Sequence, residues 1–483
     1  MAARAAGFFQ DCSAGIIGHS VAGEFARDRC HRREEKVKLK LPARVKYILD
    51  ILRQNGYEAY VVGGCVRDSV LAKEPNDWDI TTSALPEQIK ACFRRTVDTG
   101  IQHGTVTVLV GNSSFEVTTY RIDGEYSDGR HPDSVTFTGR LADDLRRRDF
   151  TINAMAYNEE NGLVDLYGGM KDLQERVVRC VGNPDERFDE DALRIMRAVR
   201  FAAQLDFGID RATYDAIASH TDDLHKVSAE RIRVELVKLL ISDHPERFMD
   251  LYELGMTRVI LPEFDACMNT PQNSIYHIWN VGEHIVHAMC EVPADTVLRI
   301  TMLLHDIGKP TVRWTDSLGR DHFKGHARVS AEMADGILRR LKFDNNTRKK
   351  CVNLIRWHDL RPKPEPADVR RTMYTVGPEN FEDFLAVQWA DDMAKSSYIR
   401  DKALQQLGRI YDVYRRIIEN GDCLSIRDLA INGRDLTEIG IRGKEVGSIL
   451  EACLMCVLRN PAMNDRELLM MYARQRVGQI LRA

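Results

Sequence analysis

The sequence predicts an α+β protein, in which a head of mixed strands and helices is followed by an extended, all-helical region. Two observations predict this class. Up to about Gly182, short β-branched segments bounded by turn residues alternate with helical ones, whereas after about Asn183 amphipathic helices follow one another nearly to the end of the chain. The composition agrees, because 44% hydrophobic and 29% charged residues are ordinary values for a globular protein.

The 483 residues suffice for about three domains. Residues 1–36 show no hydrophobic periodicity, and their most apolar stretch is interrupted by His19, so no secretory signal is predicted. We divide the chain into an extension at 1–36 that we expect to be disordered, a head at 37–182, a helical neck at 183–245, a helical body at 246–400 and a helical tail at 401–483.

Charge and cysteine content restrict the partners and the compartment. The formal net charge is −4, so a nucleic-acid partner needs a local basic surface. No stretch approaches the ~18 uninterrupted apolar residues of a membrane span, and we expect no membrane partner. The 11 scattered cysteines, including Cys453 and Cys456 in an apolar helical run, favour buried thiols in a reducing cytoplasm over disulfides or zinc.

The elements of the head follow from local patterns. Apolar residues at helical spacing predict a helix that Gly56 ends, and a short strand then leads into Gly63 and Gly64. The helices are expected at 42–55 and 66–71, and the strands at 59–62, 79–82, 104–110 and 115–121. In the neck, helices are expected at 192–204, 212–220, 229–241 and 245–254.

Three carboxylates in the head suggest a metal site. Asp77 and Asp79 enter a strand, where side chains alternate, so both point to the same side and repel each other unless a cation lies between them. Mg²⁺ suits these hard oxygen ligands. Glu116, in a neighbouring strand, could supply a third carboxylate, although its placement depends on the strand register. Taken alone, the D-x-D pattern is equally typical of a surface turn rich in aspartate.

The turn at Gly63 and Gly64 strengthens this interpretation. Without side chains, the backbone amides of such a strand-to-helix turn can approach a phosphate. A Gly-Gly turn, a D-x-D pattern and a carboxylate on another strand are together the layout of nucleotidyl transfer. Two metal ions would hold a triphosphate, lower the pKa of the attacking hydroxyl and stabilise the leaving pyrophosphate.

At this point a resemblance becomes apparent. Residues 61–68 (VVGGCVRD), followed by 76–80 (NDWDI), resemble the head of the class II tRNA nucleotidyltransferases, which include the CCA-adding enzymes and bacterial poly(A) polymerases. The resemblance continues, in order, through 147–155 (RRDFTINAM), 165–169 (DLYGG) and 190–194 (EDALR), and it covers roughly 39–240. It implies a palm-like nucleotidyltransferase head, a mixed sheet with helices, followed by a helical neck, body and tail.

The resemblance also implies roles for individual residues. Asp77 and Asp79 would hold Mg²⁺, and Glu116 would help to activate the 3′-hydroxyl of the primer. Arg148 would contact the incoming nucleotide. Taken alone, the run of arginines at 146–148 would instead indicate a solvated basic face. The implied nucleotide-binding residues are Gly63, Gly64, Arg67, Arg148, Asp149, Asn153, Asp191, Arg194 and Arg197.

Asp191 and Arg194 carry the most specific expectation. We expect the two residues, three apart, to share one face of a helix, where an ordinary salt bridge would look the same. In the family that the sequence resembles, this pair reads the base edge of ATP or CTP, since Asp accepts from the amino group that both bases carry. Residues 121–130 resemble the flexible loop with which the family switches from C to A addition, although a plain surface hairpin would also fit.

A second group of predicted ligands lies in the body. Seven of the 14 histidines fall between His277 and His358, and the sequence pair His305-Asp306 ends an apolar helix. This pattern resembles an HD phosphohydrolase site, which would hold a divalent transition metal. The predicted ligands are His284, His305, Asp306, His326, His358 and Asp391, whereas His277, His287 and His322 are interpreted as ordinary surface or core residues.

The sequence therefore predicts a template-independent enzyme that adds CCA to tRNA from CTP and ATP, with Mg²⁺ in the head. The tail is expected to bind tRNA, in part through a Gly-punctuated turn at 435–447 that could equally be a helix cap. No DNA partner is expected. The alternatives are a poly(A) polymerase or A-adding enzyme, an HD phosphohydrolase with an RNA-binding head, and a non-catalytic RNA-binding protein.

Overall fold

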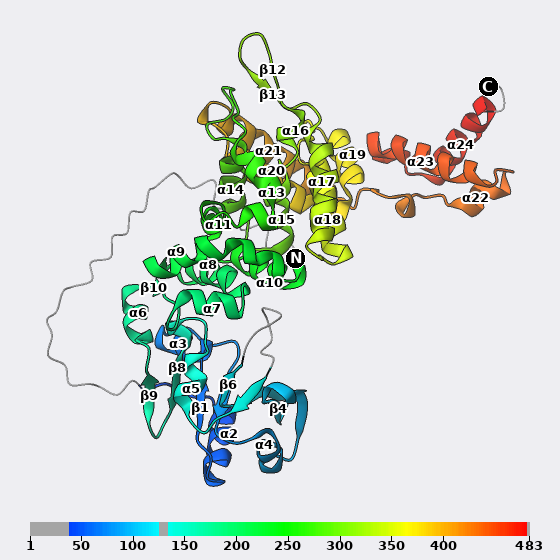
Figure 1. The fold of residues 1–483 in the computed structure, drawn as a ribbon. Helices are drawn as coiled ribbons and strands as arrows, with labels where there is room; N and C mark the ends of the chain where they lie inside the picture. Colours follow the sequence, from blue (N-terminus) through cyan, green and yellow to red (C-terminus); the bar gives the residue numbers. More distant parts are fainter. Residues whose placement is uncertain (1–37, 125–133, 481–483) are drawn as a thin grey trace. The chain divides into compact units, whose positions relative to one another are not determined.

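The structure, a computed structural model, describes residues 38–124 and 134–480. The described chain forms two compact units, one ending at Pro262 and the other beginning at Glu263 (Figure 1). The extension at 1–36 and most of the 121–130 loop lie outside the described residues.

The first unit is built on a seven-stranded mixed sheet (Figure 1). The strand order is β3-β4-β5-β2-β1-β8-β9, and β2 pairs with β5 in parallel while the other neighbours are antiparallel. The strands are β1 (Ala59–Val62), β2 (Ile80–Thr82), β3 (Thr96–Gly100), β4 (Thr105–Val110), β5 (Ser113–Thr119), β8 (Met155–Asn158) and β9 (Gly162–Asp165). A separate ribbon pairs β6 (Arg121–Asp123) with β7 (Val135–Phe137).

Helices surround this sheet and explain its local sequence patterns. α2 buries Val45, Ile48, Leu49 and Leu52, the residues whose spacing predicts it, and α3 begins at Gly64, two residues earlier than expected. The helices of the head are α2 (Ala43–Gln54), α3 (Gly64–Val70), α4 (Pro86–Cys92), α5 (Leu141–Arg146) and α6 (Gly169–Glu175), with short 3₁₀ turns η2 (Ile101–His103) and η3 (Thr151–Asn153).

The rest of the first unit is helical, and its centre is the packing of α8 on α10. A short parallel pair, β10 (Val177–Val178) with β11 (Gly208–Ile209), joins the end of the head to the chain that follows α8. The helices are α7 (Pro184–Glu190), α8 (Leu193–Leu205), α9 (Arg211–His220), α10 (Ala229–Leu240), α11 (Phe248–Glu253) and α12 (Thr257–Ile260), with 3₁₀ turns η4 (Thr221–Lys226) and η5 (Pro245–Arg247).

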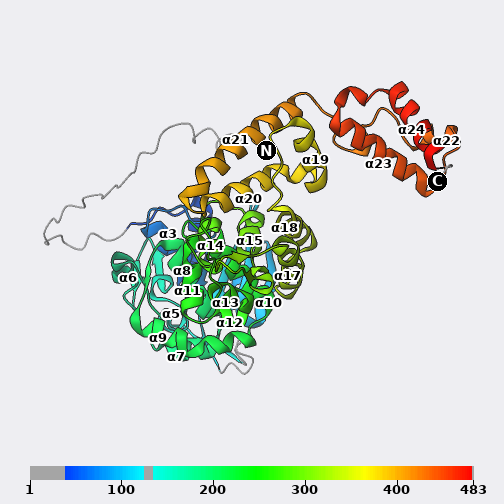
Figure 2. The ribbon, with the colours of Figure 1, turned by 90° about the horizontal axis from the view of Figure 1, so that it is seen from above.

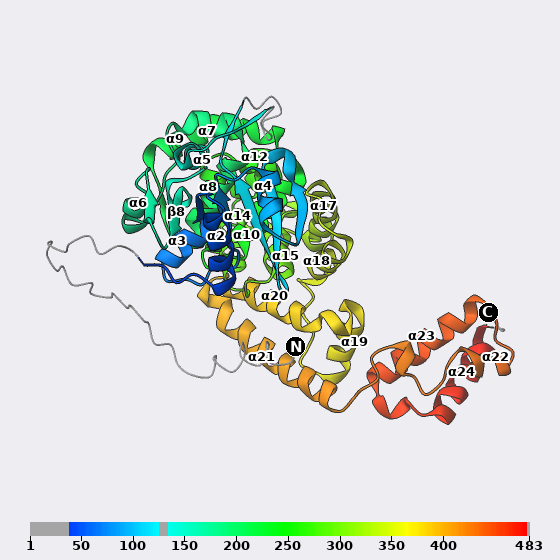
Figure 3. The same ribbon diagram turned by 90° about the horizontal axis from the view of Figure 1, so that it is seen from below.

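The second unit is helical except for one small hairpin, β12 (Trp314–Thr315) with β13 (Asp321–His322). Figure 2 shows α20 and α21 side by side, and Figure 3 shows α23 and α24 packed together. The helices are α13 (Pro262–Met268), α14 (Val281–Cys290), α15 (Thr296–Leu304), α16 (Lys309–Val312), α17 (His326–Arg340), α18 (Asn345–Trp357), α19 (Pro366–Val376), α20 (Phe381–Met393), α21 (Ser397–Glu419), α22 (Gly433–Glu438), α23 (Lys444–Arg459) and α24 (Arg466–Ile480).

The predicted fold class, a mixed α/β head followed by a helical region, is confirmed. Within the described residues, no helix combines the length and the apolar character needed to cross a membrane. The nine cysteines within that part of the chain are all free, including Cys453 and Cys456 of α23.

Candidate functional site

The turn after β1 brings a guanidinium close to its backbone. Gly63 has φ of 81°, a conformation that favours glycine, and its N–H donates to the carbonyl of Met155 at 3.1 Å. A Cβ atom at Gly63 would lie 3.1 Å from an Nη atom of Arg148. The position therefore requires glycine for two reasons, and Arg148 lies directly against the predicted phosphate-binding turn.

The three predicted carboxylates lie at or just before two neighbouring strands of the sheet, β2 and β5. Asp77 and Asp79 directly precede β2, and Ile80 pairs with Val117 in the parallel β2–β5 ladder. Continued one residue beyond the paired strands, this register would set Glu116 beside Asp79. All three residues are exposed. Nevertheless, the protein atoms around Asp79 raise the pKa of its carboxyl, Arg148 opposes this shift and Asp77 adds to it.

A buried carboxylate holds Arg148. Asp144 is fully buried and accepts hydrogen bonds from Arg147 at 2.7 and 3.0 Å, from Arg148 at 3.2 Å and from the Thr81 hydroxyl at 3.2 Å. Burial alone would raise the pKa of Asp144, but Arg147 and Arg148 together bring it below its ordinary value. Of the three arginines at 146–148, only Arg146 is exposed. Arg147 and Arg148 therefore do not form a solvated basic face. Sequence reasoning missed the role of Asp144.

Four of the predicted nucleotide-binding residues form one network between the head and α8. Asp149 accepts from Arg197 at 2.5 and 2.8 Å and from the Asn153 amide at 3.2 Å, and Asn153 in turn accepts from Arg67 at 2.6 Å. The guanidinium groups of Arg67 and Arg197 lie 5.0 and 5.3 Å from the ring centroid of Phe201. Despite burial, Arg197 lowers the pKa of Asp149.

Asp191 and Arg194 do not share one helical face, so this part of the prediction is wrong. α7 ends at Glu190 and α8 begins at Leu193, so Asp191 lies in the break between them, where its Oδ1 accepts from the Leu193 N–H at 3.0 Å. Asp191 and Arg194 also do not form the ordinary salt bridge. The carboxylate of Asp191 instead binds Arg231 of α10, at 2.7 and 3.1 Å.

Arg194 is held on the other side of this break. It pairs with Glu190 and donates to the carbonyls of Arg187 and Arg147, at 3.1 and 2.9 Å. No pattern in the sequence indicated Arg231, since its partner lies 40 positions away.

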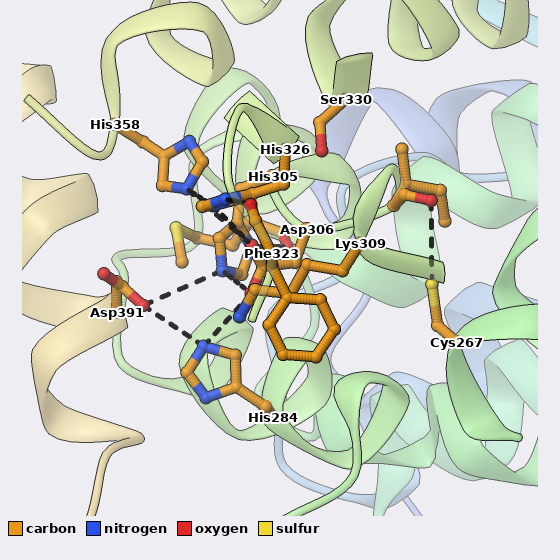
Figure 4. Close-up of polar contacts among 12 residues, drawn as sticks. Cys267, His284, His305, Asp306, Lys309, Phe323, His326, Ser330, His358 and Asp391 are labelled. Atoms are coloured by element: carbon orange, nitrogen blue, oxygen red, sulfur yellow. Dashed lines mark hydrogen bonds and ion pairs between the residues drawn. The ribbon is translucent and has the colours of Figure 1, made fainter. Parts of the chain in front are cut away.

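The six predicted ligands of the second unit come together in one buried cluster (Figure 4). The shared centre is the carboxylate of Asp306, whose Oδ2 lies 3.2 Å from Nε2 of His305 and 3.5 Å from Nε2 of His284. Its Oδ1 lies 3.3 Å from Nε2 of His326 and 3.7 Å from Nε2 of His358. Asp391 completes the group, with Oδ1 3.1 Å from Nε2 of His284.

The hydrogen bonds of these histidines suit a metal centre. Nδ1 of His305, His326 and His358 faces the carbonyl of Met302, Phe323 or Ile355, at 2.7 to 2.9 Å. An Nδ1–H donated to a carbonyl leaves Nε2 with a lone pair, and all three Nε2 atoms face the cluster.

Two features of the cluster call for a cation. Nε2 of His326 and Nε2 of His358 lie 3.1 Å apart, and two facing lone pairs repel unless a proton or a metal lies between them. Nε2 of His305 and Oδ1 of Asp306 are buried without a hydrogen-bond partner. The residues therefore fit a divalent cation. Asp306 forms a group of three possible ligands with His284 and His305, and a second such group with His326 and His358.

Cations that the sequence did not indicate surround the cluster. Lys309 lies 2.6 Å from Asp306, while Arg361 and Lys395 each lie 2.7 Å from Asp391. Burial by itself would raise the pKa of the Asp306 carboxyl, but His305 and Lys309 hold it well below its usual range. Burial, together with His305 and His326, holds the pKa of the His358 imidazole well below its usual range.

The three remaining histidines lie outside the ligand set. His277 packs edge-on against His284, and burial, with Lys309, lowers its pKa to about 2. His287 stacks on Trp279, and His322 stacks on Trp314.

The predicted turn at 435–447 extends from α22 to α23. Asp435 forms a capping box with Asn432 at the start of α22, so the helix-cap reading describes Asp435. Gly443 precedes α23, and Lys444 at the start of that helix is exposed. Binding of tRNA by this turn stays a prediction.

Comparison with family models matches three parts of the chain. Residues 59–179 match the model described as poly A polymerase head domain, residues 206–268 the probable RNA and SrmB-binding site of polymerase A, and residues 274–396 the HD domain. Fold and site thus define a nucleotidyltransferase head followed by a helical HD domain. Over 436 residues, 89% of this chain and 95% of the relative, the protein is 35% identical to the CCA-adding enzyme of Lactiplantibacillus plantarum. The chain belongs to the CCA-adding enzymes, a family of tRNA nucleotidyltransferases.

Other CCA-adding enzymes match this chain over part of its sequence or in fold. The CCA-adding enzyme of Limosilactobacillus reuteri is 54% identical over 198 residues, 41% of this chain and 49% of the relative, so the chain spans about half the length of such curated relatives. A Bacillus stearothermophilus CCA-adding enzyme in complex with CTP matches with a TM-score of 0.67 and 27% identity, over 91% of this chain and 98% of that one. A Thermotoga maritima CCA-adding enzyme complexed with tRNA_CCA shares the fold, with a TM-score of 0.56 and 20% identity over 92% and 97% of the two chains.

Proposed function

We propose that the protein adds C, C and A to the 3′ ends of tRNA, using CTP and ATP and releasing pyrophosphate. The observation that supports this proposal is the Gly63 turn with Arg148 against it, in the same head in which Asp77 and Asp79 precede β2 and Glu116 lies on the neighbouring β5. We place the reaction in the cytoplasm, in line with the free cysteines of the described chain. The tail would contribute to tRNA binding.

In this proposal, Asp77 and Asp79 would hold Mg²⁺, which suits exposed carboxylate ligands. Bound there, two ions would neutralise the triphosphate and lower the pKa of the attacking hydroxyl. The amides of the Gly63 turn and Arg148 would hold phosphate oxygens. Glu116 would accept the proton of the 3′-hydroxyl, whose oxygen forms a bond to the α-phosphorus as the bond to pyrophosphate breaks.

Nucleotide choice would depend on the break between α7 and α8. Asp191 would accept from the amino group shared by cytosine and adenine, and Arg194 would donate to the neighbouring ring atom. Uracil and guanine carry an oxygen in place of that amino group, so each would leave a carboxylate facing an acceptor.

Primer extension tests the proposal directly. Transcripts of tRNA ending before CCA, after C and after CC are incubated with Mg²⁺ and with each nucleotide separately or all four together. We expect addition to stop after three nucleotides, to use only CTP and ATP, and to be lost in Asp79→Ala. Asp98→Ala is the matched control, because Asp98 is a half-exposed head carboxylate that pairs with Lys90 at 3.1 Å.

The other outcomes separate the alternatives. Addition of ATP alone to the CC-ended transcript would indicate an A-adding enzyme, and long ATP-derived tails would indicate a poly(A) polymerase. No addition to any transcript would overturn the assignment of the head and leave an RNA-binding role.

We further propose a second, metal-dependent activity in the HD domain, the hydrolysis of a phosphoester. It is supported by the gathering of all six predicted ligands, with three facing Nε2 atoms and the buried Oδ1 of Asp306, which has no hydrogen-bond partner. The test is metal content together with hydrolysis of p-nitrophenyl and bis-p-nitrophenyl phosphate. Asp306→Ala should lose both, whereas Asp316→Ala, which changes a hairpin carboxylate bound to His322, should lose neither. Bound metal without hydrolysis would indicate a structural site.

A further inference from the structure

The carboxylate of Asp191 is occupied by a partner from outside its own segment. Arg231 donates from its two Nη atoms to the two oxygens separately, at 3.1 Å to Oδ1 and 2.7 Å to Oδ2. This is the bidentate, planar arrangement that arginine forms with carboxylates. The Leu193 N–H adds a third bond, at 3.0 Å to Oδ1, so the plane of the carboxylate is fixed.

We propose that Arg231 is the positioning residue for base selection: by holding the plane of the Asp191 carboxylate, it sets the direction in which that carboxylate accepts a hydrogen bond. The inference rests on the proposed function, since it assumes that Asp191 reads the nucleotide base. In this proposal Arg231 acts through Asp191 and does not itself contact the nucleotide.

α10 is well placed for this role. It packs on α8, and one turn after Arg231 it presents Glu235, which is buried. Glu235 pairs with Arg200 and lies 3.9 Å from Arg197, which in turn binds Asp149. Residues four apart on a helix lie on the same face, so one face of α10 contacts both Asp191 and the arginines of α8.

The geometry has a direct consequence for selectivity. A carboxylate oxygen can accept about two hydrogen bonds, so Oδ1 of Asp191, which accepts from Arg231 and from the Leu193 N–H, is filled, whereas Oδ2, which accepts from Arg231, keeps one directed site. A base amino group must approach along that remaining direction. A carboxylate free to rotate would accept from more directions and would also be free to bind water, so it would discriminate less well against an oxygen-bearing base.

The experiment measures kcat/KM for CTP and UTP on a transcript ending before CCA, and for ATP and GTP on a CC-ended transcript. In Arg231→Ala, we expect the CTP-to-UTP and ATP-to-GTP ratios of kcat/KM to fall by about 10-fold or more, the scale of a small misplacement at an active site. KM for the correct nucleotides should rise more than kcat falls. Arg231→Lys should be intermediate, since lysine supplies the charge but no bidentate fork.

A double-mutant cycle distinguishes positioning from folding. In an Asp191→Ala background, Arg231→Ala should leave the nucleotide ratios unchanged, because the carboxylate it would orient is absent. Arg211→Ala is the matched control: Arg211 is exposed and also pairs with an aspartate, Asp215, at 2.9 Å. Thermal unfolding monitors all variants, and the lysine variant remains informative if the alanine variant does not fold.

Two results would overturn the inference. One is unchanged nucleotide ratios in both folded Arg231 variants, and the other is an equal loss of kcat/KM for all four nucleotides, which is what a purely structural role produces. Failure of the proposed function would look different, because the unmodified protein would then add no CCA in the same assay.

Discussion

Replacement of Asp144 by asparagine would remove a fully buried charge from beneath the proposed phosphate site. The carboxylate accepts from Arg147, Arg148 and Thr81, and its distance to the guanidinium of Arg148 is 3.2 Å. Asparagine has nearly the same size but keeps only one acceptor oxygen. Its amide NH₂ group would face arginine donors, so the loss is one of charge and hydrogen bonding rather than of packing.

The burial of Asp144 and the partial exposure of its arginine partners together set the size of the expected loss of stability. Breaking a buried ion pair by removing one partner typically costs about 3–5 kcal/mol. The side chains of Arg147 and Arg148 are each 19% exposed, so water can solvate part of the freed charge, and Arg147 also lies 3.6 Å from Asp123. We therefore expect a decrease of about 2–4 kcal/mol in the free energy of unfolding. Arg148 would also lose its anchor, so KM for nucleotides should rise.

Urea unfolding of the full chain measures the change, with Asp143→Asn as control. Asp143 is the neighbouring residue, and its main partner is the Thr138 hydroxyl at 2.9 Å, so the control should lose less than about 1 kcal/mol. Because folding lowers the pKa of Asp144, the stabilisation it provides is present above the unfolded pKa of about 3.9 and disappears as the pH falls through the folded value. Equal stabilities of the two variants at neutral pH would refute this reasoning.

Three further predictions concern the two sites. Asp79→Asn should reduce nucleotide addition at least 100-fold, by order of magnitude, without destabilising the fold, as checked by primer extension and thermal unfolding. Gly63→Ala should cost about 1–3 kcal/mol and raise KM for nucleotides, because φ there is 81°, whereas Gly64→Ala, at a residue without positive φ, should have a smaller effect on unfolding by urea. Addition of Mn²⁺ to chelator-treated protein should raise Tm, and this rise should be lost in His305→Ala but kept in His322→Ala.

Elements with strong local signals could be predicted from the sequence. α2 follows from four apolar residues at helical spacing, and β1 from a buried run that ends at a glycine turn. The HD ligands could be found because half of the histidines lie between His277 and His358 and because the sequence pair His305-Asp306 follows an apolar helix. Their assembly from five helices is confirmed by the structure, whereas the metal itself stays a prediction.

What could not be predicted depends on contacts between distant segments. β3, with mostly exposed residues, lies at one edge of the sheet, and β8 and β9 close the other side, so none has a distinctive local pattern. The sequence does not predict α7, so the break in which Asp191 lies between α7 and α8 could not be foreseen. Asp144 and Arg231 matter only through partners brought near by folding, and a charged residue gives no sign in the sequence of whether it will be buried.

A single electrostatic arrangement connects these findings. The predicted nucleotide site gathers arginines into a small volume of a chain whose net charge is only −4, and each of them is held by a nearby acceptor. A guanidinium has five N–H donors, and one carboxylate uses two of them at most, so each arginine keeps donors for phosphate or base. Binding of a nucleotide would then add to these pairs instead of requiring charges to be repositioned, which lowers the cost of organising the site. The pairs are Arg67 with Asp68, Arg148 with Asp144, Arg194 with Glu190 and Arg197 with Asp149.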